Sequence, residues 1–314
     1  MMNSIVEFPT LPAVRTYTQL DLEFDLELKT LFSWMKPKQR PCFTSELLEE
    51  VQHFEKQIEA NAGHINHCGR PERVAYLVAG SKAAGAFNLG GDLGLFIQSI
   101  MRQDRKVLEY YAHLCIDNIY RRLTGIGGSI PTIALVQGKA LGGGFECALT
   151  SEVIIAERSA TFSFPEIMFN LIPGMGALPL LKRRIGLKKA EDIIMSGHIF
   201  SAKELHDLGV VEVLVEDGLG LETVRCYIQQ RQKKSVAYRT LFQAKQICDP
   251  ISKEELLSVV DLWVDAALQL ETRDLRMMAR LLRGQDRMLT ATNEDAELEA
   301  LYGATPLAAV GGGD

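Results

Sequence analysis

The chain has 314 residues, of which 47% are hydrophobic and 24% charged, and its formal net charge is −6. This composition is typical of one large globular domain, or of one domain with a helical extension. The acidic balance argues against a nucleic-acid-binding protein, which usually carries a basic stripe, and no apolar run reaches the roughly 18 residues of a membrane span.

The first segment, residues 1–40, shows no pattern that places it. Its start, 1–7, lacks a basic stretch followed by an apolar core, so we expect no signal peptide. His64, His67 and Cys68 are close in sequence, but without a second cluster we expect them in a polar loop and not in a metal site. Six cysteines without C-x-x-C spacing are expected to be free thiols in a reducing cytoplasm: Cys42, Cys68, Cys115, Cys147, Cys226 and Cys248.

The following segments alternate between two periodicities. Apolar residues recur at helical spacing over 47–58, which predicts an amphipathic helix, and the longer segment 95–123 has the same periodicity. Short, nearly all-apolar runs predict strands at 73–79, 132–136 and 153–156. Helices that alternate with buried strands indicate an α/β fold.

The second half of the chain becomes increasingly helical. The segment 170–176, with one proline and two glycines, predicts a turn before a helix that runs through Leu181. A strand is predicted at 210–215, and helical periodicity then runs from Leu221 almost to Leu301, before an end at 311–314 that we expect to be frayed. Two capping boxes are predicted, at Ser201 with Glu204 and at Ser252 with Glu255. We expect an α/β core over 1–217 and a helical C-terminal region over 218–314.

Two glutamates are the strongest candidates for chemistry. Glu146 ends the run 141–146, which contains three consecutive glycines, and Glu166 ends the segment Phe164-Pro165-Glu166. A carboxyl pair on apolar, glycine-rich ground suits an enzyme that moves two protons in one reaction. In one apolar pocket the two should titrate apart, so that one stays protonated near neutral pH. The alternative for Glu166 is an ordinary surface charge.

The glycine triplet 142–144 is a weak signal on its own, because it fits neither a phosphate-binding loop nor a dinucleotide-binding motif. An ordinary strand-to-helix turn is the alternative explanation. However, the strand predicted at 132–136 leads into the triplet and a helix is expected to follow. An amide at such a helix start has no intrahelical partner, so it can donate to a ligand oxygen.

A second loop of this kind, residues 86–93, contains Gly90, Gly91 and Asp92. It too follows a predicted strand and precedes a predicted helix, and Asp92 could simply cap that helix. Two strand-to-helix junctions with glycine amides are what a two-donor oxyanion hole requires.

The ordered set of motifs in 86–93, 140–146, 164–166 and 172–174 resembles the crotonase superfamily, also called the enoyl-CoA hydratase/isomerase superfamily. The resemblance covers roughly residues 70 to 215 and implies a crotonase-like ββα-superhelix core. The amino-acid sequences of segments 87–93 and 164–176 resemble those of the diffusible signal factor synthases within this superfamily. That closer likeness extends into the N-terminal and C-terminal parts.

The resemblance implies roles for individual residues. The amides of Gly91 and Gly143 would form the oxyanion hole, and Glu146 and Glu166 would be the acid/base pair. Substrate-binding residues would be Leu141, Gly142, Met175 and Trp263, the last of which we expect to cap the acyl end of the pocket. Core packing is the alternative for Trp263, which lies on an apolar helical stripe.

The implied reaction is dehydration of a 3-hydroxyacyl thioester, followed by hydrolysis of the thioester to release a cis-2-unsaturated fatty acid. Neither Ser163 nor Cys147 has an adjacent histidine, so both are expected to be packing residues. No cofactor is implied. The carrier would be acyl carrier protein or coenzyme A. A basic cluster could dock the acidic carrier protein, although an exposed helix face explains it as well: Lys182, Arg183, Arg184, Lys188 and Lys189.

Two other functions remain open. An enoyl-CoA hydratase of fatty-acid degradation would use the same catalytic residues. The second alternative is a function of a different class, in which the protein binds the receiver domain of a sensor kinase and restrains that kinase. This function is compatible with catalysis. The resemblance also implies a homotrimer or a dimer of trimers.

Overall fold

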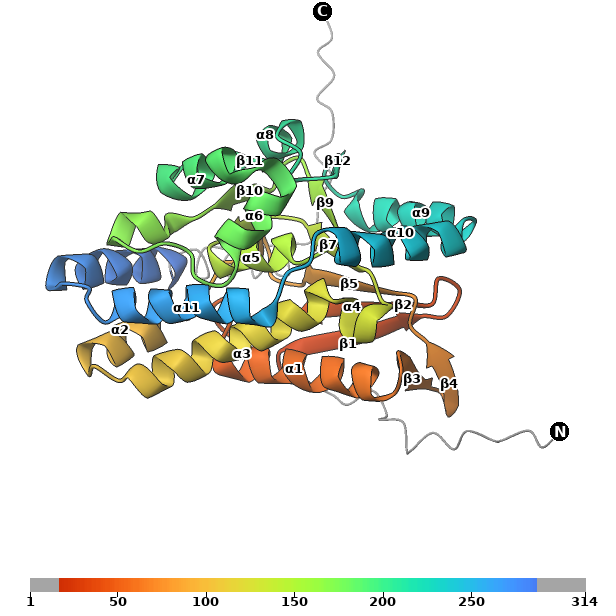
Figure 1. Ribbon diagram of the computed structural model, residues 1–314, viewed down its shortest axis with the longest axis horizontal. Coiled ribbons are helices and arrows are strands. Elements are labelled where there is room, and N and C mark those ends of the chain that lie inside the picture. The colour runs from red at the N-terminus through yellow and green to blue at the C-terminus, as the bar shows by residue number, and fades with distance from the viewer. Residues whose placement is uncertain (1–16, 287–314) are drawn as a thin grey trace, which may run out of the picture.

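The computed structural model describes residues 17–286, and their arrangement is shown in Figure 1. Its framework is a six-stranded sheet in the order β1-β2-β5-β7-β9-β12. Every neighbouring pair is parallel except β1 and β2. The strands are β1 (Leu20–Asp25), β2 (Thr30–Met35), β5 (Tyr76–Ser81), β7 (Thr132–Val136), β9 (Val153–Glu157) and β12 (Val213–Val215).

The sheet is buried on both faces, which explains why its central strands are mostly apolar. In β7, Ile133 and Leu135 face a smaller core beneath α9, whereas Ala134 and Val136 face the main core. Helix α9 (Gly220–Gln232) covers the smaller core with Val224 and Ile228. Because successive side chains of a strand point to opposite faces of the sheet, β7 contributes residues to both cores.

A second sheet has four strands in the order β11-β10-β8-β6. They are β6 (Ala86–Asn88), β8 (Lys139–Leu141), β10 (Thr161–Ser163) and β11 (Phe200–Ser201). The pairs β6–β8 and β8–β10 are parallel, so the segments that follow these three strands leave the sheet at the same edge. Those segments contain Gly90, Gly142 and Glu166. A separate antiparallel hairpin consists of β3 (His64–His67) and β4 (Arg70–Arg73).

Helices surround the two sheets (Figure 1). They are α1 (Ser45–Ala60), α2 (Leu93–Met101), α3 (Arg105–Leu123), α4 (Gly125–Gly128), α5 (Gly143–Leu149), the 3-10 helix η1 (Pro165–Phe169), α6 (Ala177–Ile185), α7 (Leu187–Ser196), α8 (Ala202–Asp207), α10 (Ser235–Cys248) and α11 (Lys253–Ala267). Residues 272–286 are also helical. The α/β crotonase-like fold expected from the sequence is confirmed, with mixed sheets and a helical C-terminal region.

Several predicted elements are confirmed. The amphipathic helix at 47–58 is α1, whose Leu47, Leu48, Val51, Phe54 and Ile58 are all buried. The strands at 132–136 and 153–156 are β7 and β9, and the turn at 170–176 precedes α6. Asp92 is the N-cap of α2, because its Oδ1 accepts hydrogen bonds from the amides of Gly94 (3.0 Å) and Leu95 (3.1 Å).

Other predicted boundaries were wrong. The strand placed at 73–79 begins only at Tyr76, and the strand placed at 210–215 begins at Val213. The segment 95–123 is two helices, because Asp104 caps a new helix with its side chain. His64 and His67 are in the β3–β4 hairpin and not in a loop. The helical C-terminal segment is divided into separate helices, and the predictions for Leu301 and 311–314 lie outside the described residues.

The two predicted capping boxes differ. At the start of α8, Ser201 and Glu204 exchange both hydrogen bonds, as predicted. At the start of α11, Ser252 accepts from the amide of Glu255 at 3.0 Å, but the Glu255 carboxylate binds Arg183. The Glu255 carboxylate does not complete the capping box because Arg183 forms two charge-assisted hydrogen bonds with it.

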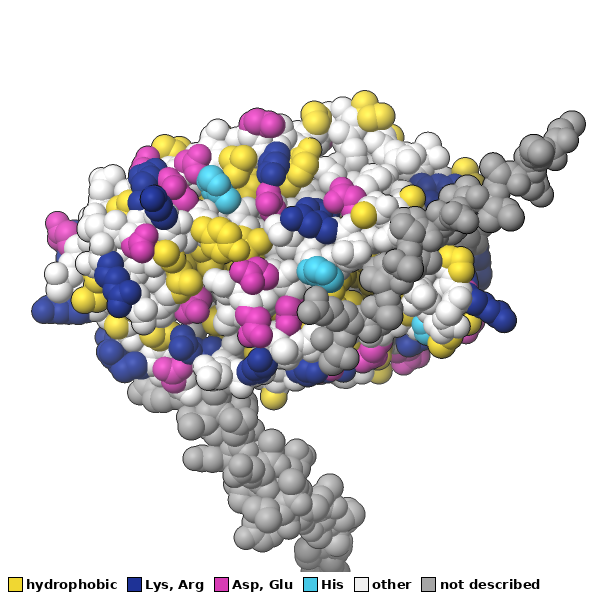
Figure 2. All heavy atoms as spheres, turned by 90° about the horizontal axis from the view of Figure 1, so that it is seen from below, with side chains coloured by type: hydrophobic (Ala, Val, Ile, Leu, Met, Phe, Trp, Pro, Cys, Tyr) yellow, Lys and Arg dark blue, Asp and Glu magenta, His cyan; other side chains and the backbone are white. Residues whose placement is uncertain are grey.

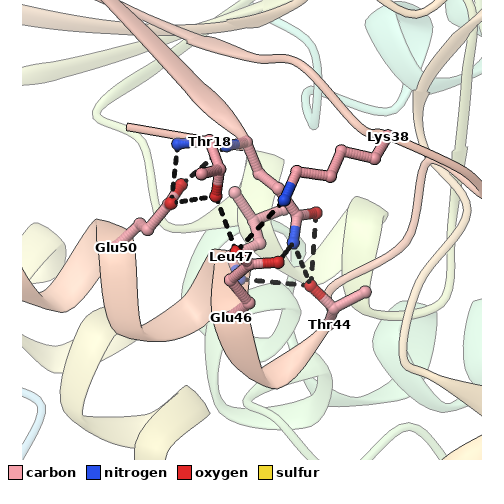
Figure 3. A network of polar contacts seen from close by, with 7 residues as sticks. Thr18, Lys38, Thr44, Glu46, Leu47 and Glu50 are labelled. Carbon is pink, nitrogen blue, oxygen red and sulfur yellow. Dashed lines mark hydrogen bonds and ion pairs between the residues drawn. The ribbon is translucent and has the colours of Figure 1, made fainter. Parts of the chain in front are cut away.

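The start of β1 is held against α1 by a polar network (Figure 3). One Glu50 carboxylate accepts from the amides of Thr18 and Gln19, each at 2.8 Å. The Thr18 hydroxyl also donates to Glu46 at 2.7 Å, and Gln19 Nε2 donates to Thr44 Oγ1 at 2.9 Å. This network fixes the edge strand over the helix that supplies Leu48 and Val51 to the cavity described below.

The surface seen from below Figure 1 carries acidic and basic side chains intermixed, with apolar side chains in small groups (Figure 2). Within residues 17–286, no helix is both long and apolar enough to cross a membrane.

Candidate active site

A cavity of about 560 Å³ lies between α1, α3, α5, α11 and the helix at 272–286. It brings together nearly all the residues singled out in the sequence. The predicted residues that line it are Gly91, Leu141, Gly143, Glu146, Glu166, Met175 and Trp263. Gly142 does not line the cavity itself but lies against the Glu166 carboxylate, since a Cβ there would be 2.3 Å from Glu166 Oε1.

The two glycine loops are in direct contact at the cavity wall. A Cβ on Gly90 would lie 2.8 Å from the carbonyl oxygen of Leu141, and one on Gly143 would lie 3.5 Å from the amide nitrogen of Gly91. Within the described part of the chain, the amides of Gly91 and Gly143 donate to no other group. Two neighbouring amides without partners, on the wall of one cavity, are available to a ligand oxygen.

Close backbone contact fixes the separation of these loops. A Cβ on Gly144 would lie 2.1 Å from the carbonyl oxygen of Asn88, a distance that no side chain could tolerate. Asn88 in turn accepts a hydrogen bond from the amide of Gly90 at 2.8 Å through Oδ1. The second glycine loop therefore packs directly on the end of β6.

Tyr111 on α3 holds the first glycine loop in place. Its buried hydroxyl donates to the carbonyl oxygen of Phe43 at 2.6 Å and accepts from the amide of Asp92 at 3.3 Å. Phe43 also pairs with Gly91 in an isolated β-bridge. One hydroxyl thus links both chain segments that flank the Gly91 amide.

We expect Tyr111→Phe to lower kcat by roughly threefold to tenfold, which corresponds to the net value of one or two buried hydrogen bonds. KM should change little, because the ring still fills its site. Steady-state kinetics of the purified variant checks this expectation. A fall in kcat/KM carried by KM alone would show that the hydroxyl does not position the loop.

Glu146 lies on the short helix α5 and is buried. Its Oε1 accepts a hydrogen bond from the amide of Ala177 at 3.0 Å. Burial raises the pKa of Glu146 to about 7, and the hydrogen bonds from the amides of Ala177 and Met175 oppose that rise. The carboxyl is therefore close to its titration midpoint at neutral pH.

Glu166 follows Pro165 in the first turn of η1, and its carboxyl lies against Gly142, which has no side chain to block the contact and whose φ of +50° favours glycine. Its Oε2 is buried and has no hydrogen-bond partner among the described residues. Burial, and then the charge of Glu146, raise the pKa of Glu166 to about 8. The two carboxyls thus lie close enough to influence each other, and they disfavour simultaneous ionisation.

The cavity extends along α3 from Tyr111 to Arg122, about 16 Å at the usual helical rise. Its walls are mostly apolar, with Leu48, Val51 and Ile119 among them. Arg122 also lines the cavity, and its Nε donates to the buried Glu55 at 2.6 Å. Such a lining offers an apolar chain an apolar surface to pack against.

The predicted packing residues have different environments. Ser163 is buried, and its carbonyl oxygen accepts a hydrogen bond from the amide of Gly142 at 2.8 Å. Cys147 lines the cavity, and its Sγ accepts from Arg122 Nη1 at 3.3 Å. Burial raises the pKa of the Cys147 thiol, which disfavours the reactive thiolate.

Trp263 lies near the glycine loops. Its indole packs directly on Gly174, where a Cβ would be 2.4 Å from Trp263 Cγ, and it meets the Phe96 ring edge-on with a centroid distance of 5.1 Å. Phe96 in turn covers Gly91. Trp263 is therefore a wall of this cavity as well as a core residue.

The basic cluster around α6 is partly structural. Arg183 binds Glu255 and the carbonyl oxygen of Pro250, and Arg184 binds Glu212 and the carbonyl oxygen of Ser151. The three lysines are exposed, and Lys188 pairs with Asp192 at 2.7 Å. The cluster is therefore neither a wholly exposed helix face nor five free charges.

Sequence reasoning missed Tyr111, Glu55 and Arg122. All three lie on α1 or α3, where they occupy buried positions of amphipathic helices. The signal that could have identified Glu55 and Arg122 is that each is a charged residue on the apolar face of its helix. Because buried charges usually occur as pairs, two such residues are expected to bind each other.

Comparisons with known proteins agree with this site. Residues 68–294 match the family described as enoyl-CoA hydratase/isomerase. The probable enoyl-CoA hydratase echA8 of Mycobacterium tuberculosis is 30% identical over 200 residues, which cover 64% of this chain and 70% of that protein. The mevalonyl-coenzyme A hydratase SIDH of Beauveria bassiana is 38% identical over 91 residues, which cover 29% of this chain and 32% of that protein. The chain thus spans only about a third of the length of this second relative.

The crystal structure of enoyl-CoA hydratase from Bacillus halodurans has the same fold, with a TM-score of 0.69 and 22% sequence identity over 84% of this chain and 100% of that one. The family match extends from the β3–β4 turn to beyond the last described residue, and it includes both glycine loops and both glutamates. The chain belongs to the enoyl-CoA hydratase/isomerase family.

Proposed function

We propose that the protein dehydrates a 3-hydroxyacyl thioester and then hydrolyses the enoyl thioester, releasing a cis-2-unsaturated fatty acid of the diffusible signal factor type. The observation that carries this proposal is the presence in one cavity of the buried Glu146, the partly buried Glu166 and two unpartnered glycine amides. The mostly apolar lining of the same cavity along α3 supports a long apolar acyl chain as the substrate. The amino-acid sequences of segments 87–93 and 164–176 support signal synthase activity over the activities of other members of the family.

In the first step, the amides of Gly91 and Gly143 donate to the thioester oxygen. Charge that develops on this oxygen as the α-proton leaves is stabilised, and one such donor is typically worth about 3 kcal/mol. The ionised glutamate accepts the proton from C2, and the protonated glutamate gives its proton to the hydroxyl that leaves C3. The C3–O bond breaks, a C2–C3 double bond forms, and water is released.

In the second step, the same amides stabilise the tetrahedral oxyanion. A glutamate accepts a proton from water as its oxygen attacks the carbonyl carbon, the C–S bond breaks, and the carrier thiol leaves with a proton. Cys147 is not needed as a nucleophile, in keeping with its raised pKa. The proposed substrate carrier is acyl carrier protein, with coenzyme A as the alternative.

Incubation with 3-hydroxyacyl carrier protein, and separately with the matching coenzyme A thioester, tests the proposal. Mass spectrometry should detect free cis-2-unsaturated fatty acid, and the double variant Glu146→Gln/Glu166→Gln should yield none. Accumulation of enoyl thioester without free acid would instead support an enoyl-CoA hydratase, the function that the relatives' names favour.

The proposed role in restraining a sensor kinase belongs to a different class, and the same double variant separates it from catalysis. Binding of an isolated receiver domain would be measured by calorimetry with the wild type and with this variant. Retained binding without product would show two independent functions.

The division into a core at 1–217 and a trimer-forming, pocket-covering region at 218–314 likewise remains a prediction. Measurement of the molecular mass in solution checks whether the protein is a trimer.

We expect Trp263→Ala to lower turnover and to broaden the range of acyl chain lengths accepted, because the indole covers the cavity between Gly174 and Phe96. Competition between acyl thioesters of different lengths measures this preference. Leu262→Ala is the matched control, because Leu262 is 67% exposed on the same helix. Unchanged preference and turnover in Trp263→Ala would remove Trp263 from the substrate site.

A further inference from the structure

A second cavity, of about 470 Å³, lies on the other side of the six-stranded sheet. It is formed by the first residues of strands β5, β7, β9 and β12 together with α9 and α10, which lie side by side in Figure 1. It shares no lining residue with the cavity that contains Glu146 and Glu166. Nothing in the proposed reaction uses it.

Arginine and tyrosine side chains dominate the polar lining. The Arg231 guanidinium lies between two aromatic rings, 4.2 Å from the centroid of Tyr227 and 4.3 Å from that of Tyr238. Stacking of this kind holds the guanidinium plane in place and leaves its N–H edge free. A guanidinium fixed in this way is prepared for bidentate binding of an oxyanion.

The positive charge of this cavity is not neutralised from within. Arg73 and Arg239 also line it, and within residues 17–286 none of the three arginines has a carboxylate partner. The two carboxylates of the lining are already engaged, since Glu152 binds Lys245 at 2.6 Å and Glu212 binds Arg184. The unpaired arginines are unusual in a chain whose net charge is −6.

The count of charges indicates what kind of anion would fit. Four cationic side chains and two carboxylates line the cavity, but Glu212 is paired with Arg184 from outside the lining, which leaves an excess of three positive charges on the arginines. A phosphate monoester, with a charge of about −1.5 to −2 at neutral pH, matches that excess better than a single carboxylate does. Apolar walls that include Val74, Ile133 and Phe242 suit an organic body attached to the phosphate.

We propose that this second cavity binds an organic phosphate monoester, with Arg231 gripping the phosphate and Arg73 and Arg239 neutralising it. The site is separate from the reaction cavity, so the proposal stands or falls independently of the proposed function. A nucleoside monophosphate and a phosphorylated polyol share the required chemistry. The tyrosine rings would favour the former through stacking.

Isothermal titration calorimetry at constant ionic strength, adjusted with potassium chloride, tests the proposal. Adenosine 5′-monophosphate, glycerol 3-phosphate and inorganic phosphate are titrated separately into the full chain. We expect saturable binding at one site, and tighter binding of the nucleotide if the rings stack on a base. Absence of saturable heat with all three ligands would overturn the proposal.

Substitutions test whether the phosphate ligands bind in this cavity. Arg231→Met keeps the aliphatic stem between the rings but removes the charge, so affinity should fall at least tenfold. Lys189→Met removes one exposed charge elsewhere and should bind as the wild type does. If Arg231→Met does not fold by circular dichroism, Arg239→Met replaces it, because Arg239 is exposed. Unchanged affinity in both arginine variants would show that the phosphate binds elsewhere.

Discussion

Replacement of Glu166 by glutamine is expected to lower turnover by roughly 10²- to 10⁴-fold, the usual contribution of a general acid or base. Glutamine keeps the shape of the side chain, but it can neither accept nor supply the proton. Glu146→Gln should have an effect of the same order. The double variant should be little worse than either single variant, because the two carboxyls act as a unit.

Turnover of the thioester, followed by loss of the hydroxyacyl form in mass spectrometry, measures this effect. Glu152→Gln is a suitable control, since Glu152 forms an ion pair with Lys245 outside the catalytic cavity. If Glu166→Gln kept more than about a tenth of the wild-type turnover, Glu166 would not be the acid or the base.

The same two substitutions should change how stability depends on pH. Burial raises the pKa of Glu146 to about 7 and that of Glu166 to about 8, from 4.5 for a free glutamate. Between pH 4.5 and 8 the folded protein therefore holds more protons than the unfolded chain, and stability falls as pH rises. The double variant should lose less Tm than the wild type between pH 5 and 8. An equal loss would contradict the raised pKa values.

Arg122→Met is expected to reduce the free energy of unfolding by roughly 3–5 kcal/mol, which is the usual cost of breaking a buried ion pair from one side. It leaves Glu55 fully buried, with Oε2 already lacking a hydrogen-bond partner among the described residues. Urea denaturation measures the loss. Arg121→Met, which removes the neighbouring arginine paired with the half-exposed Glu59, should cost less than about 1 kcal/mol.

The double variant Glu55→Met/Arg122→Met distinguishes charge from packing. Methionines of similar volume restore an apolar interior, so most of the stability lost in Arg122→Met should return. A double variant that is as unstable as Arg122→Met would indicate that shape around Glu55 and Arg122 matters more than charge.

Short-range patterns in the sequence predicted the parts of this fold that depend on a single element. Helix α1 and strands β7 and β9 followed from apolar periodicity, and the Asp92 cap from its position before a helix. Strand β1 was not predicted, although Leu20, Leu22 and Phe24 alternate with polar residues. That strand is stabilised by pairing with β2, and its register cannot be read from one segment alone.

The candidate site was predicted to the extent that its residues lie in contiguous motifs. Both glutamates and both glycine loops were found in this way. Tyr111 and the Glu55–Arg122 pair were not, because they join segments 68 and 67 positions apart in the chain. The strand predicted at 73–79 was too long for a similar reason, since the β3–β4 hairpin ends just before Tyr76.

The backbone contact between Gly144 and Asn88 has a consequence for how this scaffold could diversify. Close main-chain contact, supported by Asn88 and Tyr111, sets the spacing of the two donors, so replacing wall residues such as Ile119 or Val51 should leave that spacing intact. Substrate choice could then drift across homologues while the reactive geometry stays constant. Redesign for a new acyl group should therefore begin at the far wall and leave the glycine loops unchanged.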